Sequence, residues 1–261
     1  KQQTQQIMSE KLASALEQAG ISRIVFIRHA NAAPPDGSKP KKGEIPIHDW
    51  QRDDQMRPLT DKGKQQAAVA REWFQSDIGV ASNKILVTSG ARRASETLQL
   101  LAEQKAKKQG FMAGLLGCGK ADTLGMEVGM ELLPSLHPAG IAPKCEALFD
   151  QNGYAPLQKF YDMEGGEAAF AEYAEIVAGE LCSLCTKIER APGSSVSVFG
   201  HAVFLNAVAM MLAGKAWGAS AETVQQLKTL DLGEAEGIEV KREGGTCAVR
   251  HISVRPHALW A

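Results

Sequence analysis

Three short apolar runs stand out along the chain, and each is followed by polar residues that open a helical pattern. The runs lie at residues 24–27, 85–87 and 196–199. Their apolar, β-rich character, broken only by Ser197 in the third run, predicts strands that are buried on both faces of a sheet. Two further strands are predicted at residues 237–242 and 247–254, around the turn Gly244-Gly245, and a short one near residues 126–133.

Helical patterns separate these runs. They are predicted at residues 8–19, which Gly20 ends, at 60–75 with Thr60 as the N-cap, and at 90–107, 166–190 and 202–213. Strands that alternate with helices predict an α/β fold, a mostly parallel sheet between two layers of helices. We expect one domain over residues 1–261, interrupted by a Pro- and Gly-rich loop at 31–58 and a cap-like insertion at about 109–165.

The charge of the chain argues against two classes of partner. Lys and Arg total 29 and Asp and Glu total 30, which gives a formal net charge of −1. No global positive field draws in nucleic acid or an acidic membrane, and no stretch approaches the roughly 20 apolar residues of a membrane span. An anionic ligand must therefore be attracted locally, by a few placed cations.

The cysteines indicate a reducing compartment. There are five, an odd number without dense spacing, so we expect free thiols and a cytoplasmic location. The first ten residues are polar and lack the apolar core of a secretory signal, although a targeting segment that has already been removed stays open. Cys182 and Cys185 form a C-x-x-C, but they lie in a helical pattern without further ligands nearby, which favours helix packing over a metal site.

The candidate chemistry follows the apolar runs. Because ligands bind beyond the carboxyl ends of strands in an open α/β sheet, the residues directly after each run are the candidates for a ligand-binding site. The first run delivers Arg28 and His29, the second delivers Ser89 and then Arg92 and Arg93, and the third delivers His201. Arg binds phosphate bidentately, and neutral imidazole is a competent nucleophile near pH 7. If the strands are neighbours, their ends predict a site for phosphoryl transfer.

Four ordered motifs carry a family resemblance. They are Arg28-His29-Ala30 after the first run, Arg57-Pro58-Leu59-Thr60-x-x-Gly63, the segment from Thr88-Ser89 to Arg93-Ala94-x-x-Thr97, and Gly200-His201. Over about residues 22–213 the chain resembles the histidine phosphatase (phosphoglycerate mutase-like) superfamily, and the Arg-Pro-Leu-Thr segment makes it most similar to small phosphohistidine phosphatases. The resemblance implies a three-layer α/β/α fold and a reaction that needs neither metal nor cofactor.

The resemblance also implies roles. His29 matches the nucleophile that becomes phosphohistidine, Arg28 and Arg93 match the phosphate-binding arginines, and His201 matches the second pocket histidine. Arg92 competes with Arg93 for its assignment. Ser89 and Asn31 are expected beside the substrate, where Asn31 adds a further donor.

The general acid is where the chain departs from the family. Related mutases carry a Glu after the strand that follows the second motif, and no acid stands in that place here. His137 is the candidate proton donor, with a polar loop residue as the competing interpretation. We therefore expect a phosphatase for a phosphorylated small molecule or phosphoprotein with a good leaving group, such as phosphohistidine or an acyl phosphate. A mutase-like phosphotransferase and a non-catalytic phospho-ligand binding module remain the alternatives.

Overall fold

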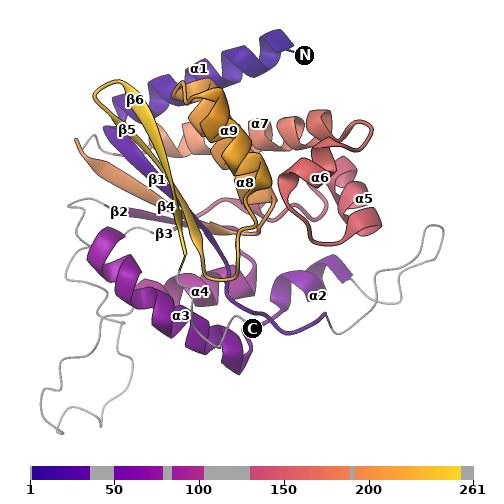
Figure 1. The fold of residues 1–261 in the computed structure, drawn as a ribbon. Coiled ribbons are helices and arrows are strands. Elements are labelled where there is room, and N and C mark those ends of the chain that lie inside the picture. Colours follow the sequence, from indigo (N-terminus) through magenta and orange to yellow (C-terminus); the bar gives the residue numbers. More distant parts are fainter. Residues whose placement is uncertain (1, 36–49, 79–83, 103–129, 189–191, 254–261) are drawn as a thin grey trace, which may run out of the picture.

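A computed structural model describes residues 2–35, 50–78, 84–102, 130–188 and 192–253 of the chain. In these residues a sheet has the strand order β3-β2-β4-β1-β5-β6 (Figure 1). The strands are β1 (Ile21–Arg28), β2 (Lys84–Thr88), β3 (Met130–Leu132), β4 (Ser194–Gly200), β5 (Gly237–Glu243) and β6 (Thr246–Ile252). The first four strands in this order are parallel, β5 pairs antiparallel with β1, and β6 pairs antiparallel with β5. The predicted α/β fold with a mostly parallel sheet is confirmed.

Helices cover both faces of the sheet. Helices α3 and α4 pack on one face, and α1, α7 and α8 pack on the other (Figure 1). The α-helices are α1 (Gln2–Gln18), α2 (Trp50–Met56), α3 (Asp61–Trp73), α4 (Arg92–Ala102), α5 (Pro143–Asn152), α6 (Leu157–Tyr161), α7 (Gly166–Cys185), α8 (Phe204–Met211) and α9 (Ala221–Thr229). Three short turns of other helix types are η1 (Phe74–Ile78), η2 (Pro134–Leu136) and η3 (Leu212–Ala216).

Strand β1 shows why a short apolar run indicates a central strand. Successive side chains of a strand point to opposite faces of the sheet. Ile24 and Phe26 belong to the core under α1, α7 and α8, whereas Val25 and Ile27 belong to the core under α3 and α4. All four side chains are fully buried. Over these four positions, a strand with helices on both faces buries an apolar side chain at every residue.

The termini of two helices follow the predicted capping chemistry. The hydroxyl of Thr60 accepts a hydrogen bond from the backbone N–H of Gly63 at 3.0 Å, so Thr60 is the N-cap of α3. Gly20 adopts a φ of +74° directly after α1, a conformation that favours glycine. Both local signals predicted the helix boundary to within a few residues.

Two predicted irregular segments contain helices. Helix α2 lies within the predicted loop 31–58, and α5 and α6 lie within the cap-like insertion 109–165, for which the sequence indicated only one short strand. Helix α2 has the sequence Trp-Gln-Arg-Asp-Asp-Gln-Met, which carries no apolar stripe and gives no periodic signal. Residues 36–49 and 109–129 of the two segments lie outside the described residues. That the whole chain forms one domain stays a prediction.

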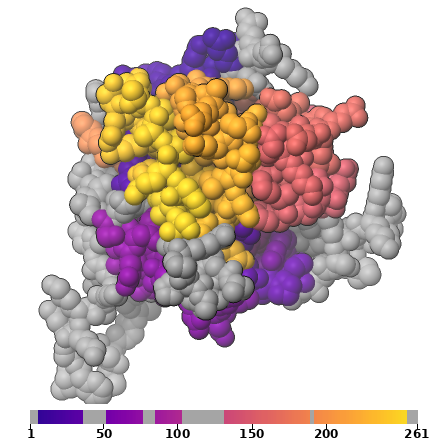
Figure 2. Space-filling view, viewed as in Figure 1, coloured from indigo at the N-terminus to yellow at the C-terminus, as the bar shows by residue number. Residues whose placement is uncertain are grey.

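The space-filling view places the segment that holds α5 and α6 beside α9, with the β5–β6 hairpin on the same side of the molecule (Figure 2).

Cys182 and Cys185 lie on α7 as free thiols. Burial raises the pKa of both, to about 11 for Cys185, and Cys185 packs in the core. Their surroundings fit helix packing. No helix in the described ranges is long and apolar enough to cross a bilayer.

Candidate active site

The carboxyl ends of three neighbouring strands meet at one edge of the sheet. Strand β4 lies between β1 and β2. Arg28, the last residue of β1, pairs with Gly200 of β4, and Thr88 of β2 pairs with Phe199. The residues that leave the sheet next are therefore adjacent, and they are His29, Ser89 and His201. The backbone N–H groups of His29 and Ser89 both donate to carbonyl groups of β4, at 3.0 and 3.1 Å.

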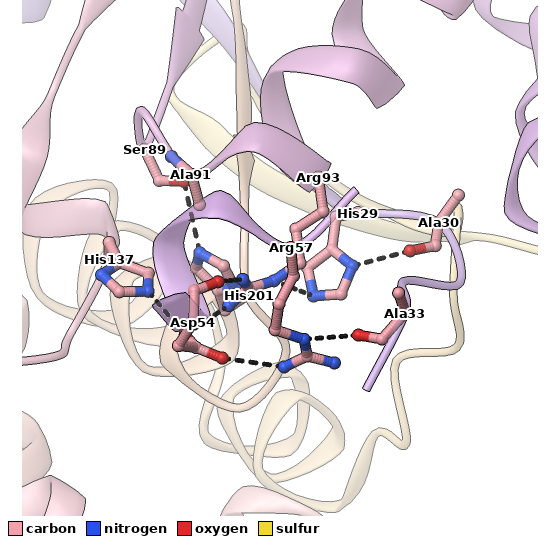
Figure 3. Close-up of polar contacts among 10 residues, drawn as sticks. All are labelled: His29, Ala30, Ala33, Asp54, Arg57, Ser89, Ala91, Arg93, His137 and His201. Atoms are coloured by element: carbon pink, nitrogen blue, oxygen red, sulfur yellow. Dashed lines mark hydrogen bonds and ion pairs between the residues drawn. The ribbon is translucent and has the colours of Figure 1, made fainter. Parts of the chain in front are cut away.

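His29 is held as a neutral imidazole with a defined tautomer. Its Nδ1 lies 2.7 Å from the backbone oxygen of Ala30, and because a carbonyl only accepts, Nδ1 carries the proton (Figure 3). The lone pair is therefore on Nε2, which accepts a hydrogen bond from Nε of Arg93 at 3.3 Å. Burial and then the charge of Arg93 lower the pKa of His29 well below its usual 6.5. The ring is consequently available as a nucleophile at neutral pH.

Arg93 is the arginine of α4 that faces this edge. It is 4% exposed, and its Nη2 donates to Nδ1 of His201 at 3.3 Å in addition to the contact of Nε with His29. Arg92, the competing candidate, points away: its Nε donates to Glu96 at 2.7 Å and its side chain is 49% exposed. The first turn of α4 thus places the guanidinium of Arg93 in the site and that of Arg92 on the surface.

His201 connects Arg93 to the end of β2. Since Arg93 only donates, Nδ1 of His201 accepts, and Nε2 carries the proton and donates to the hydroxyl of Ser89 at 3.2 Å. The ring centroids of His201 and His29 are 5.1 Å apart. Burial and the charge of Arg93 lower the pKa of His201 well below 6.5, so this ring is neutral as well.

Arg28 brings a second guanidinium to the edge. Its Nη1 donates to the backbone oxygen of Leu232 at 2.7 Å, and its Cζ lies 4.4 Å from the centre of the Tyr154 ring. Its buried Nε has no partner within the described part of the chain. The side chain is therefore fixed at two points and keeps hydrogen-bonding capacity for a ligand.

Asp54 and Arg57 are site residues that the sequence did not single out for chemistry. Asp54 accepts from Nη1 of Arg57 at 2.8 Å, from Nη2 of Arg93 at 3.0 Å and from Nε2 of His137 at 3.0 Å (Figure 3). Burial raises the pKa of Asp54, but the hydrogen bond from His137 and the charge of Arg93 outweigh it and hold that pKa well below its usual range. Only the motif that begins at Arg57 pointed to this segment.

His137 reaches the same cluster from the far end of β3. It follows η2 directly, it is 6% exposed, and its ring centroid is 5.1 Å from that of His201. Its contact with the carboxylate of Asp54 places the proton on Nε2. The side chain is buried within the cluster, and its role as a proton donor stays a prediction.

The polar groups of Asn31 form hydrogen bonds with other residues of the protein. Its Nδ2 donates to Glu234 at 2.8 Å, and its Oδ1 accepts from the hydroxyl of Thr60 at 2.6 Å. Its backbone N–H donates to Gln66 at 2.8 Å. Asn31 thereby ties the segment after β1 to α3, and its side chain does not line the cavity described next.

A cavity of about 470 Å³ opens over these residues. Its inner part is cationic, and its outer part is formed by aromatic and acidic side chains of α5 and its neighbours. The lining residues are Arg28, His29, Ala32, Pro35, Asp54, Arg57, Arg93, His137, Pro138, Ala139, Glu146, Phe149, Asp150, Tyr154, His201, Ala202, Phe204 and Glu234. Three guanidiniums and a nucleophilic imidazole at the inner end suit a phosphoryl group, and the outer part has room for the group that bears it.

Comparison with known proteins gives one family match. The model described as histidine phosphatase superfamily (branch 1) matches residues 24–118, which hold the first three motifs but not His201. No curated protein matches this chain.

Solved structures give likenesses of low sequence identity. The protein histidine phosphatase SixA complexed with tungstate is 16% identical, with 89% of this chain and 97% of that chain covered and a TM-score of 0.43. YhfR of Bacillus stearothermophilus is 16% identical, with 91% and 98% covered and a TM-score of 0.46. Phosphoserine phosphatase of Entamoeba histolytica, in complex with 3-phosphoglyceric acid, is 17% identical, with 89% and 98% covered and a TM-score of 0.48.

Proposed function

We propose that this chain is a phosphatase of the histidine phosphatase superfamily (branch 1), whose model matches residues 24–118, and that it forms a phosphohistidine on His29. One observation carries the proposal. Nε2 of His29 holds a lone pair inside a cavity that three guanidiniums line, because Nδ1 is committed to the carbonyl of Ala30. A nucleophilic nitrogen and a set of phosphate-binding cations are thus combined in one space.

In the first step the phosphoryl oxygens replace Nε2 of His29 as the acceptor for Nε of Arg93, and the freed lone pair of Nε2 attacks phosphorus in line with the leaving group. An N–P bond forms, the bond from phosphorus to the leaving group breaks, and the leaving group takes the electron pair. The imidazole becomes positively charged as it is phosphorylated, and the hydrogen bond from Nδ1 to Ala30 stabilises that charge. Arg28, Arg57 and Arg93 stabilise the charge on the phosphoryl oxygens.

In the second step water attacks phosphorus. The N–P bond breaks, the electron pair returns to Nε2, and inorganic phosphate leaves with the oxygen of the water. The protein supplies positioned charge in both steps, and no residue changes its oxidation state. His201 contributes through Arg93, because its Nδ1 accepts a hydrogen bond from Nη2 of Arg93, and Ser89 holds the ring by accepting from its Nε2.

The leaving group sets the substrate class. His137 is the candidate proton donor, and its Nε2 proton is engaged with Asp54. Protonation of a departing alkoxide would therefore require this hydrogen bond to be broken. A phosphohistidine or an acyl phosphate leaves without strong protonation, so a phosphoprotein or small molecule with such a group is the proposed substrate. We keep the cytoplasm as its compartment, on the cysteine usage of the sequence.

The proposal is tested by trapping the intermediate. The protein is mixed with a phosphohistidine peptide, with acetyl phosphate and with an alkyl phosphate, then quenched, and acid-labile phosphate on the protein is measured beside phosphate release. We expect a phosphoenzyme that His29→Asn abolishes, and turnover of the peptide or acetyl phosphate at least tenfold faster than that of the alkyl phosphate. Equal rates would contradict the leaving-group argument.

The same experiment separates the two alternatives. A mutase-like enzyme forms the phosphoenzyme but passes the phosphoryl group to a second substrate, so it releases little free phosphate. A binding module forms no phosphoenzyme, and its affinity for a phosphopeptide is the same in the wild-type protein and in His29→Asn. Either result would contradict the proposed phosphatase.

A further inference from the structure

Asp54 contacts more of the cluster than any role proposed so far requires. Its carboxylate accepts hydrogen bonds from Arg57, Arg93 and His137, and its backbone oxygen accepts a further one from Nη1 of Arg93. These donors come from three separate parts of the fold, namely the end of α2, the first turn of α4 and the residue after η2. One side chain therefore connects three elements that line the cavity.

Two edges of the guanidinium of Arg93 contact different partners. The edge formed by Nη1 and Nη2 faces the backbone oxygen and the carboxylate of Asp54. The edge formed by Nε and Nη2 faces Nε2 of His29 and Nδ1 of His201, each at 3.3 Å. Because a guanidinium is planar and rigid, fixing one edge fixes the direction of the other (Figure 3).

We propose that Asp54 is a positioning residue of the reaction, which holds Arg93 by one edge so that the other edge meets the phosphoryl group at His29. The inference rests on the proposed phosphatase function. Asp54 also fixes the ring of His137 through Nε2 and the side chain of Arg57 through Nη1. Helix α2 thereby completes the site, although none of its described side chains, residues 51–56, belongs to the two cores.

A competing role for Asp54 is that of an internal anion, which occupies the cationic pocket until substrate displaces it. The two roles differ in what the loss of charge does. In Asp54→Asn the pocket becomes more positive, so an anion in the ground state binds as well as before or better. If Asp54 positions Arg93, the transition state loses stabilisation all the same, because a misplaced group costs up to about 100-fold in rate.

The test compares kcat, KM and the inhibition constant of inorganic phosphate in the wild type, Asp54→Asn, Asp54→Glu and Asp61→Asn. Asp61 is the matched control, because its side chain is 92% exposed and its carboxylate pairs with Lys64 on α3. We expect Asp54→Asn to lower kcat about 10- to 100-fold without weakening phosphate binding more than threefold, and Asp61→Asn to match the wild type. Asp54→Glu, which keeps the charge at a different reach, should recover only part of kcat. A melting curve for each variant separates loss of folded protein from loss of rate.

Other outcomes overturn the inference. Unchanged kcat with phosphate bound tenfold more tightly would identify the internal anion instead. A parallel loss of kcat and of phosphate binding, with a lowered melting temperature, would identify a merely structural residue. A wild-type protein without phosphatase activity contradicts the proposed function and the inference together. If the wild type is active and Asp54→Asn has the same kcat and the same phosphate binding, the inference alone is contradicted.

A double-mutant cycle tests whether Asp54 acts through Arg93. If it does, Asp54→Asn should cost about tenfold or more in kcat in the wild-type background and less than threefold in an Arg93→Lys background, since lysine has no second edge to hold. Equal costs in both backgrounds would show that the two residues act independently and would overturn the proposal.

Discussion

Nε of Arg93 donates a hydrogen bond to Nε2 of His29 over 3.3 Å, so a guanidinium from α4 is directed at the nitrogen that the end of β1 delivers. The two residues are 64 positions apart in the sequence. A phosphoryl group bound at Nε2 would therefore meet positive charge immediately beside the bond that forms. The predictions below depend on this juxtaposition and on the residues that maintain it.

Arg93 and Arg92 should differ sharply when each is replaced by alanine. Arg93→Ala removes a buried donor set beside the nucleophile, and we expect kcat/KM to fall about 10²- to 10³-fold, as for the loss of one preorganised oxyanion donor. Arg92→Ala removes an exposed pair with Glu96 and should leave kcat/KM within about threefold of the wild type. Steady-state kinetics on a phosphohistidine peptide checks both. Comparable losses would place Arg92 at the substrate after all.

Ser89→Ala should change activity through His201. The hydroxyl of Ser89 accepts from Nε2 of His201, and without it the imidazole loses one of the two hydrogen bonds that hold the ring in place. We expect kcat to fall about tenfold, as for lost supporting contacts of a positioned ring, with the melting temperature changed by only a few degrees. Ser183→Ala, at an exposed serine that donates only within α7, is the control and should behave as the wild type. An unchanged kcat in Ser89→Ala would show that the contact between Ser89 and His201 does not affect the rate.

Acidification should destabilise the protein from about pH 6.5 downward. The folded-state pKa values of His29 and His201 are well below 6.5, mainly because both rings are buried. Between that lower value and 6.5 the unfolded chain binds more protons than the folded one, so stability falls as the pH falls. Each ring contributes up to about 1.4 kcal/mol per pH unit in this window.

Urea unfolding at pH 7.5, 6.5, 5.5 and 5.0 measures this dependence. The double variant His29→Asn, His201→Asn should show a shallower decline below pH 6.5, because asparagine does not titrate. Identical slopes in the two proteins would mean that neither ring is held neutral by the fold.

Gly63→Ala should be strongly destabilising. A Cβ at Gly63 would stand 2.0 Å from the backbone oxygen of Asn31, and backbone cannot move aside cheaply. We expect a loss of about 3 kcal/mol or more in the free energy of unfolding, as for other overpacked buried sites, together with lower activity because Asn31 follows the nucleophile by two residues. Gly179→Ala in α7 meets nothing within 4 Å and should be neutral or stabilising by up to about 1 kcal/mol. Chemical denaturation of both variants provides the measurement, and equal effects would contradict the close approach.

The predicted strands and the residues at their ends could be derived from the sequence because they obey local rules. A run such as residues 24–27, with apolar side chains at every position, fits only a strand with a core on each face, and its end is the first place where Arg28 and His29 reach solvent. The capping hydroxyl of Thr60 marked the start of α3 in the same way. These signals lie within a few residues of the feature that they predict.

The partners of those residues were decided by the tertiary structure. Asp54 stands on a seven-residue polar helix without periodicity, and His137 follows a three-residue strand, so no local pattern connects either to His29. The resemblance favoured Arg93 over Arg92, and the packing of α4 directs Arg93 at His29 and leaves Arg92 paired with Glu96. Asn31 donates to Glu234 and accepts from Thr60. The sequence by itself determined the strands, their order along the chain and the cationic residues at their ends. The carboxylate that holds Arg93 in place depends on hydrogen bonds between segments tens of residues apart, and such bonds form only after the chain has packed.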